Sequence, residues 1–183
     1  VDNVKATNTG NAIFIRLGQM HREPGILRNI VIRNMAIQVP WRRPDYDYEM
    51  RGPALPFFHN VFPSSIVGLP GHPVENVTLE NILITYPGRG NPAYANLPLS
   101  RLDQVPELPK KYPEFSMFGE LPAWGIYARH VNGLTMRNMR IQIRKPDYRP
   151  AVVLDDVQGF SKQRLQIDGD DKSGDDVVNH NGR

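Results

Sequence analysis

The chain has 183 residues, no cysteine and a formal net charge of +3. This length fits one domain, the lack of cysteine excludes disulfides and thiolate metal sites, and the mild positive charge suits an acidic partner without requiring one. No run of about 18 apolar residues is present, so the sequence predicts no membrane span.

A pattern of two short alternating strands recurs along the chain. Its copies are anchored on their first apolar residues, Val4, Ile30, Val77, Leu134 and Phe160. The first two anchors are 26 positions apart, and so are the last two. A unit of this size cannot bury its apolar face alone, so the repeat predicts a stacked solenoid. The longer spacings before Val77 and before Leu134 predict two long loop insertions.

Apolar residues alternate within each copy, as at Ile30 and Ile32, and this period of two is typical of strands. The alternation changes register once per copy, at Asn34, Asn81 and Asn138. Asparagine tolerates left-handed backbone and hydrogen-bonds to neighbouring backbone groups, so we expect the chain to turn a corner at these positions. Stacked copies would then form one continuous apolar core.

The implied fold class is all-β, a parallel β-helix over residues 1–167 with an acidic polar tail at 168–183. The pattern begins mid-unit, without the polar cap that covers a solenoid end. We therefore expect residues to precede Val1 in the parent protein. The tail is acidic but lacks the loop pattern of a calcium site, so we expect it to be frayed, and the sequence predicts no metal and no cofactor.

Charged residues end a strand that recurs at residues 11–18 and in two later copies. The three strand-ending residues are Arg16, Arg129 and Asp155. In a β-helix this row lies along one sheet of the groove where ligands bind, so Arg16 is a candidate to bind an anion. The alternative is a solvent-facing arginine paired with a neighbouring carboxylate. His21 and Arg22 follow in a short loop, which is either part of the site or a surface turn.

The first insertion, residues 40–63, begins with aromatic and basic residues. Trp41 and Tyr46 offer flat apolar faces for sugar rings, and Arg42 offers a planar fork for a carboxylate. The alternative is that the acidic residues of the same segment simply pair with its arginines.

His72 precedes the third copy in a stretch rich in glycine and proline, and it is either a general acid or base or a structural residue. The second insertion, residues 87–122, is rich in proline. We expect it to be a long loop with one short helix near residues 99–105 that leans on the strands or walls the groove.

The repeats, the strand ending at Arg16 and the stretch from Gly68 to Val77 together resemble the C-terminal half of glycoside hydrolase family 28. These polygalacturonase-like enzymes are right-handed parallel β-helices that cleave pectin. The resemblance covers residues 1–167 and implies an acidic, pectin-like polysaccharide as partner, no nucleic acid, a secreted or periplasmic location and a monomer at full length. It implies that Arg16 binds a uronate carboxylate, and the full set of candidate substrate-binding residues is Arg16, His21, Arg22, Trp41, Arg42, Tyr46 and His72.

The catalytic residues are not assigned. The family's Asn-Thr-Asp, Asp-Asp and Gly-His-Gly motifs lie N-terminal to the region matched here, and its Arg-Ile-Lys motif falls on Phe14, Ile15 and Arg16. The pair Asp155 and Asp156 stands in the wrong chain order for the family's acids. We therefore expect the chain to supply substrate-binding strands and loops of a hydrolase and to be inactive alone. A non-catalytic carbohydrate-binding β-helix and a polysaccharide lyase are the alternatives.

Overall fold

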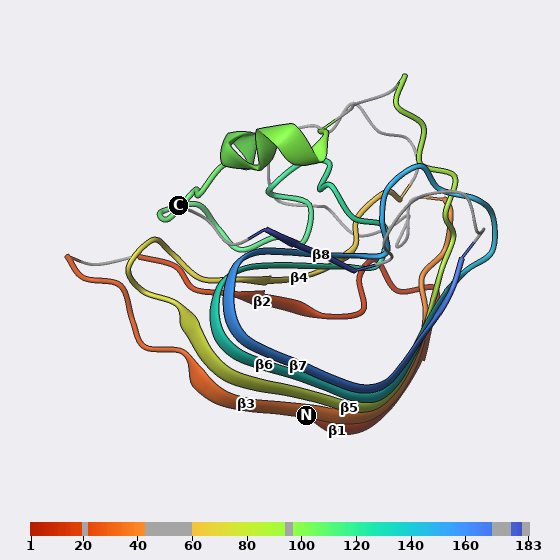
Figure 1. Cartoon of the computed structure of the whole chain (residues 1–183), viewed down its shortest axis with the longest axis horizontal. Coiled ribbons are helices and arrows are strands. Elements are labelled where there is room, and N and C mark those ends of the chain that lie inside the picture. Colours follow the sequence, from red (N-terminus) through yellow and green to blue (C-terminus); the bar gives the residue numbers. More distant parts are fainter. Residues whose placement is uncertain (20–21, 43–59, 94–96, 170–176, 181–183) are drawn as a thin grey trace.

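The structure is a computed structural model that describes residues 1–19, 22–42, 60–93, 97–169 and 177–180. One eight-stranded sheet dominates it (Figure 1). The elements are β1 (Asp2–Thr7), β2 (Phe14–Arg16), β3 (Arg28–Gln38), β4 (Ser64–Val67), β5 (Val74–Tyr86), the 3₁₀-helix η1 (Leu99–Gln104), β6 (Ile126–Ile143), β7 (Val152–Asp168) and β8 (Val177–His180). Within the described ranges, no helix is long and apolar enough to cross a membrane.

The sheet curls because β6 and β7 each run through both of its halves. The beginning of β6 pairs with the short strand β4, and the remainder of β6 pairs with the long strand β5. All these strand pairs are parallel, as are those at the two ends of the sheet. The parallel stacking that the repeat predicted is therefore confirmed, and so is the short helix predicted in the second insertion.

The register confirms four of the five predicted anchors and corrects the first. Ile30 pairs with Val77, Val77 with Leu134, and Leu134 with Phe160. Val4, however, pairs with Met35 rather than aligning with Ile30. The segment at the start of the chain matches the second strand of a unit, because β1 begins at the second corner and lies beside only the later part of β3.

The corner row, which we define as Asn3, Asn34, Asn81, Asn138 and Arg164, holds left-handed backbone in five successive strands. Its φ angles are 57°, 56°, 54°, 50° and 54°. The side chains also form a ladder, in which Asn81 donates from Nδ2 to Oδ1 of Asn34 at 3.1 Å and Asn138 donates to Asn81 at 2.7 Å. The predicted left-handed corners at Asn34, Asn81 and Asn138 are thus confirmed, whereas the hydrogen bonds of the ladder join side chains to each other rather than to backbone groups.

A second left-handed row turns the chain five residues earlier. Asn29 and Asn76 begin it, and Gly133 and Gly159 continue it, with φ angles from 54° to 83°. Asn76 donates to Asn29 at 3.1 Å. A Cβ atom on Gly133 would lie 2.9 Å from Oδ1 of Asn76, so this position needs glycine for space as well as for its φ of 83°.

The rows between the corners point into the core as predicted. Ile32, Val77, Leu79, Leu134 and Met136 are all buried, with exposures of 6% or less. Ile30 is only partly buried, because β1 begins to pair with β3 at Arg33 and leaves this earlier residue at the edge of the sheet. The core is therefore continuous from strand to strand, and its weakest cover lies at the N-terminal edge.

The C-terminal segment does not wholly follow its prediction. Val177–His180 form β8 and pair in parallel with Val152–Asp155 of β7. The expectation of a frayed tail is wrong for these four residues, because Val177 packs against the main core and Val178 against the second insertion.

The buried ion pair between Arg149 and Asp147 forms hydrogen bonds to the ends of both insertions. The Arg149 guanidinium donates to both carboxylate oxygens of Asp147 at 3.0 Å and to the carbonyl oxygens of Val61 at 2.8 Å and Leu121 at 3.2 Å. Asp147 also accepts from the backbone N–H of Gly90 at 2.8 Å. The pKa of Asp147 is lowered: burial alone would raise it, but the hydrogen bonds from Arg149 outweigh burial.

The corner row makes a test of backbone strain possible at Asn81. Asn81→Gly removes the ladder hydrogen bonds but keeps a residue suited to positive φ, whereas Asn81→Ala loses both. We expect the alanine variant to be the less stable by about 1 kcal/mol, the order of the cost of left-handed backbone in an L-residue. Urea unfolding of both variants measures the difference. Equal free energies of unfolding would show that left-handed backbone carries no such cost at this corner.

Candidate binding site at the ends of the short strands

The strand-end row, which we define as Arg16, Val67, Arg129, Asp155 and His180, occupies one position in five stacked strands. Each of these residues is the register partner of the next. The sequence predicted that Arg16, Arg129 and Asp155 stand at equivalent positions, and the register confirms this. Val67 separates Arg16 from Arg129, so the charged side chains fall into two groups.

The second insertion covers the face of the sheet that carries this row. Val67, Tyr127 and Val153 alternate with the residues of the main core and point to the opposite face. They are at most 2% exposed because they pack against Ala123 and against apolar residues of the insertion: Leu102, Val105, Met117, Phe118 and Leu121. Figure 1 shows η1 and the neighbouring loop lying above β2, β4 and β8. This face is therefore filled by the chain's own loop.

Arg16 holds part of that loop. Its guanidinium donates to the carbonyl oxygen of Lys111 at 3.0 Å and also to that of Leu108. The backbone N–H of Gln19 donates to Pro109 between them at 2.8 Å. Burial lowers the pKa of Arg16. The structure thus gives Arg16 a role in fixing the loop, while its predicted contact with a sugar carboxylate stays a prediction.

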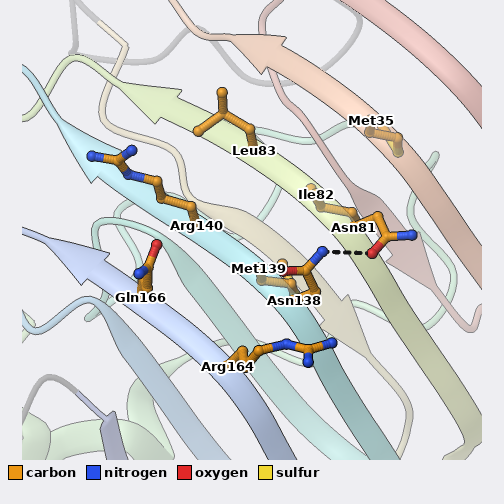
Figure 2. A pocket seen from close by; sticks show the side chains of 9 residues that line it. All are labelled: Met35, Asn81, Ile82, Leu83, Asn138, Met139, Arg140, Arg164 and Gln166. Carbon is orange, nitrogen blue, oxygen red and sulfur yellow. Dashed lines mark hydrogen bonds between the residues drawn. The ribbon is translucent and has the colours of Figure 1, made fainter.

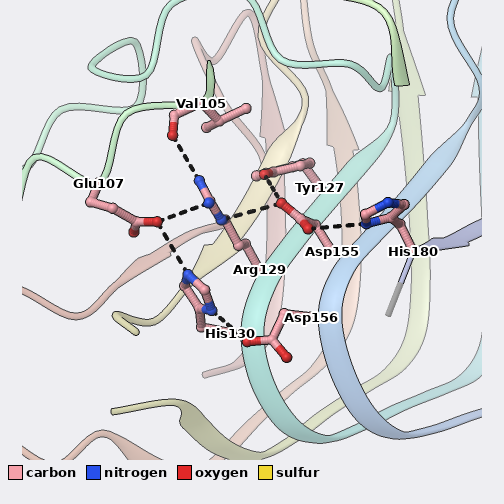
Figure 3. A network of polar contacts seen from close by, with 8 residues as sticks. All are labelled: Val105, Glu107, Tyr127, Arg129, His130, Asp155, Asp156 and His180. Atoms are coloured by element: carbon pink, nitrogen blue, oxygen red, sulfur yellow. Dashed lines mark hydrogen bonds and ion pairs between the residues drawn. The ribbon is translucent and has the colours of Figure 1, made fainter. Parts of the chain in front are cut away.

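Arg129 is the centre of a polar network between the insertion and the strands (Figure 3). It donates to the carbonyl oxygen of Val105 at 2.7 Å, pairs with Glu107 at 2.9 Å and pairs with Asp155 at 3.2 Å. The Tyr127 hydroxyl donates to the same oxygen of Asp155 at 3.0 Å. Burial and the nearby Asp155 carboxylate raise the pKa of Tyr127. Two carboxylates therefore share one guanidinium that is only 12% exposed.

His130 extends the network around the next corner. Its Nδ1 lies 2.6 Å from Oδ2 of Asp156, and its Nε2 lies 3.2 Å from Oε1 of Glu107. His130 and Asp156 are stacked corner residues with φ of 50° and 55°. The pKa of His130 is raised: burial lowers it, but the hydrogen bonds to Glu107 and Asp156 outweigh burial and the repulsion from Arg129. Protonated His130 donates to both carboxylates and so ties the insertion to the strands.

A small pocket of about 180 Å³ opens beside this histidine. His130 and Asp156 line it together with the polar side chains of Asn132 and Gln158. The turn from Leu69 to His72 forms another wall, and these two residues exchange backbone hydrogen bonds of 2.9 and 2.8 Å. His72 itself is exposed at this turn. The pocket has acid, base and amide groups, which suit a hydroxylated ligand.

The remaining predicted site residues lie apart or outside the described ranges. Arg22 is exposed, and its carbonyl oxygen accepts from the Gln19 side chain at 2.8 Å. Trp41 lies just after β3 with the Arg89 guanidinium 5.1 Å from its ring centre, and Arg42 beside it is exposed. His21 and Tyr46 lie outside the described residues. Among the described residues, no group of three histidines or carboxylates is arranged to hold a metal ion.

Sequence reasoning missed Glu107, His130 and the contact of His130 with Asp156. The 26-residue repeat does align His130 with Asp156, so the pairing was readable from the spacing. Glu107 carried no such signal because it lies in an insertion without periodicity. Comparison with models of known protein families, with curated proteins and with solved structures finds no match to this chain. The inference of function therefore rests on the residues themselves.

The raised pKa of His130 predicts how stability depends on pH. A histidine whose folded pKa exceeds its unfolded value, about 6.5, contributes stability that is fully present below that value. The contribution is lost as pH rises through the folded pKa. We expect the stability difference between the parent chain and His130→Gln to be largest near pH 5.5 to 6 and to shrink through neutral pH, as measured by urea unfolding. A difference that grows with pH would contradict this assignment.

Proposed function

We propose that this chain is part of a right-handed parallel β-helix in a pectin-degrading glycoside hydrolase resembling family 28, and that it supplies substrate-binding strands and loops. The observation that carries the proposal is the stack of parallel strands in register, in which Arg16 and Arg129 share one position and hold the second insertion against the strands. Curled parallel sheets with grafted loops are the framework on which such a groove is built. The complete protein acts as a secreted or periplasmic monomer on galacturonate-containing polysaccharide.

We propose two exposed contact points for an oligosaccharide: Arg22, which lies apart from the pocket beside His130, and His72 on the turn at that pocket. Together with the pocket they are called the strand-end site. Arginine binds a carboxylate with two parallel hydrogen bonds, which suits a uronate unit. His72 and the amide groups of the pocket offer partners for sugar hydroxyls. Arg16 supports the strand-end site by holding residues 108–111 against the strands.

The carboxylates of the network favour binding over catalysis in this chain. Inverting hydrolysis needs one carboxylic acid that donates a proton and one carboxylate that activates water. Glu107 and Asp155 are both paired with Arg129, and Asp156 is bound to His130. None of these three is placed as a free acid–base pair. This observation also keeps a non-catalytic carbohydrate-binding β-helix as the second candidate function; a lyase has no comparable support.

Binding of acidic oligosaccharide tests the strand-end site. We expect the chain to bind a hexamer of galacturonate more tightly than a hexamer of galactose in calorimetric titration. Arg22→Ala should weaken binding of the uronate hexamer by about 1.5–3 kcal/mol, the value of a charged hydrogen bond. Arg101→Ala, which removes an exposed arginine from the insertion, is the control. Equal affinity for the two hexamers would contradict the proposal.

Catalysis is tested separately by the release of reducing sugar. We expect this 183-residue chain alone not to hydrolyse polygalacturonate, because the network carboxylates Glu107, Asp155 and Asp156 are each paired with Arg129 or His130. A version extended at its N-terminus by the family's acidic motifs should gain the factor of about 10²–10⁴ that general acid–base catalysis supplies. Turnover by the short chain would overturn the division into binding and catalytic parts and would direct attention to Asp155 and Asp156.

A further inference from the structure

A second pocket lies on the outer face of the long half of the sheet, away from the second insertion (Figure 2). We call it the corner groove and define it by its exposed residues on β5, β6 and β7: Asn81, Leu83, Asn138, Arg140, Arg164 and Gln166. Its volume is about 470 Å³, within the usual range of ligand sites. Every residue that lines it belongs to a strand, so the sheet itself shapes it.

The asparagine ladder ends in this groove with an arginine. Asn138 donates to Asn81, and the next position of the corner row is Arg164. Arg164 has φ of 54°, a backbone conformation that asparagine adopts far more readily than arginine. The four other members of the corner row are asparagine, so an arginine held in this disfavoured conformation suggests a use for its side chain.

The groove also carries positive charge that its own lining does not neutralise. Two arginines and no carboxylate line it among the described residues. Arg140 pairs with Asp168 through Nε at 2.5 Å, and Arg164 has no ion pair within the described part of the chain. Figure 2 shows the Arg164 guanidinium on the side of Asn138, whereas the Arg140 side chain extends along its strand in the opposite direction. The unpaired Arg164 is therefore open to an anion.

The types of side chain identify the class of ligand. A guanidinium fork matches a carboxylate, and amide side chains both donate to and accept from hydroxyl groups. Leu83, which is 39% exposed, offers an apolar contact for the C–H face of a sugar ring. A nucleic acid would favour a longer basic surface and aromatic side chains that stack on bases, and no aromatic side chain lines the groove among the described residues.

We propose that the corner groove is a second binding surface for acidic oligosaccharide, separate from the strand-end site. A uronate carboxylate would lie on Arg164, and hydroxyl groups on Asn138 and Gln166. Three neighbouring strands span about 10 Å, so the groove fits a short oligomer rather than one ring. The choice of a uronate polymer rests on the proposed function, whereas the charge and shape of the groove do not.

The test is nuclear magnetic resonance of the whole chain titrated with a hexamer of galacturonate. We expect the side-chain amide signals of Asn138 and Gln166 to shift with the uronate hexamer and not with a galactose hexamer or inorganic polyphosphate. Arg164→Asn should weaken binding of the uronate hexamer about tenfold, because one charged hydrogen bond is lost. This variant restores the residue type of the corner row, so it should unfold at the same temperature as the parent or higher.

Arg28→Asn is the matched control, because it removes an exposed arginine of β3 that does not line the groove. An equal loss in both variants, or no shift of the two amides, would overturn the proposal. The proposal would also be overturned if the two amide signals shifted equally with the galactose hexamer, or more strongly with polyphosphate. The ring signals of His72 and His130 report the strand-end site in the same titration. Failure of one site is therefore distinguished from failure of the other.

Discussion

The structure depends on left-handed backbone at the same positions of successive parallel strands. A strand that bends without losing its register must place one residue in this conformation at each corner, and L-residues other than asparagine, aspartate and glycine adopt it at a cost. Asparagine meets the constraint and also hydrogen-bonds to the asparagine of the neighbouring strand, as Asn81 does with Asn34. The corner rows thereby fix the register, and the register in turn brings apolar residues together in the core and charged residues together at the strand ends.

The stacked strands have two outer faces, and the second insertion covers only one of them. The face above the short strands is filled by the second insertion, which packs apolar side chains on Val67, Tyr127 and Val153 and is fastened by Arg16 and Arg129. The face of the long strands, by contrast, keeps its corner groove. The insertion therefore decides which part of a regular surface becomes interior and which remains available to a ligand.

In the Arg129 network, charged side chains attach the second insertion to the strands rather than form a catalytic acid–base pair. Two partly buried carboxylates placed near each other would repel, and Arg129 relieves this by pairing with both Glu107 and Asp155. Buried pairs of this kind contribute little net stability, but the loss of one partner leaves an uncompensated charge, so they specify one arrangement of the loop. His130 adds a contact to Glu107 that depends on its protonation, and the attachment of the loop therefore responds to pH.

The sequence by itself determined the parallel strands, the corner residues Asn34, Asn81 and Asn138 and the equivalence of Arg16, Arg129 and Asp155, because all of these follow from periodic positions in a repeat. It misplaced Val4, since a single short strand matches either half of the unit and only pairing with β3 selects one. Tertiary structure alone decided that the loop covers the strand-end row and that Glu107 meets Arg129 and His130. Those contacts join an insertion without periodicity to distant strands, and their geometry is set by the path of the loop and by packing rather than by any spacing along the chain.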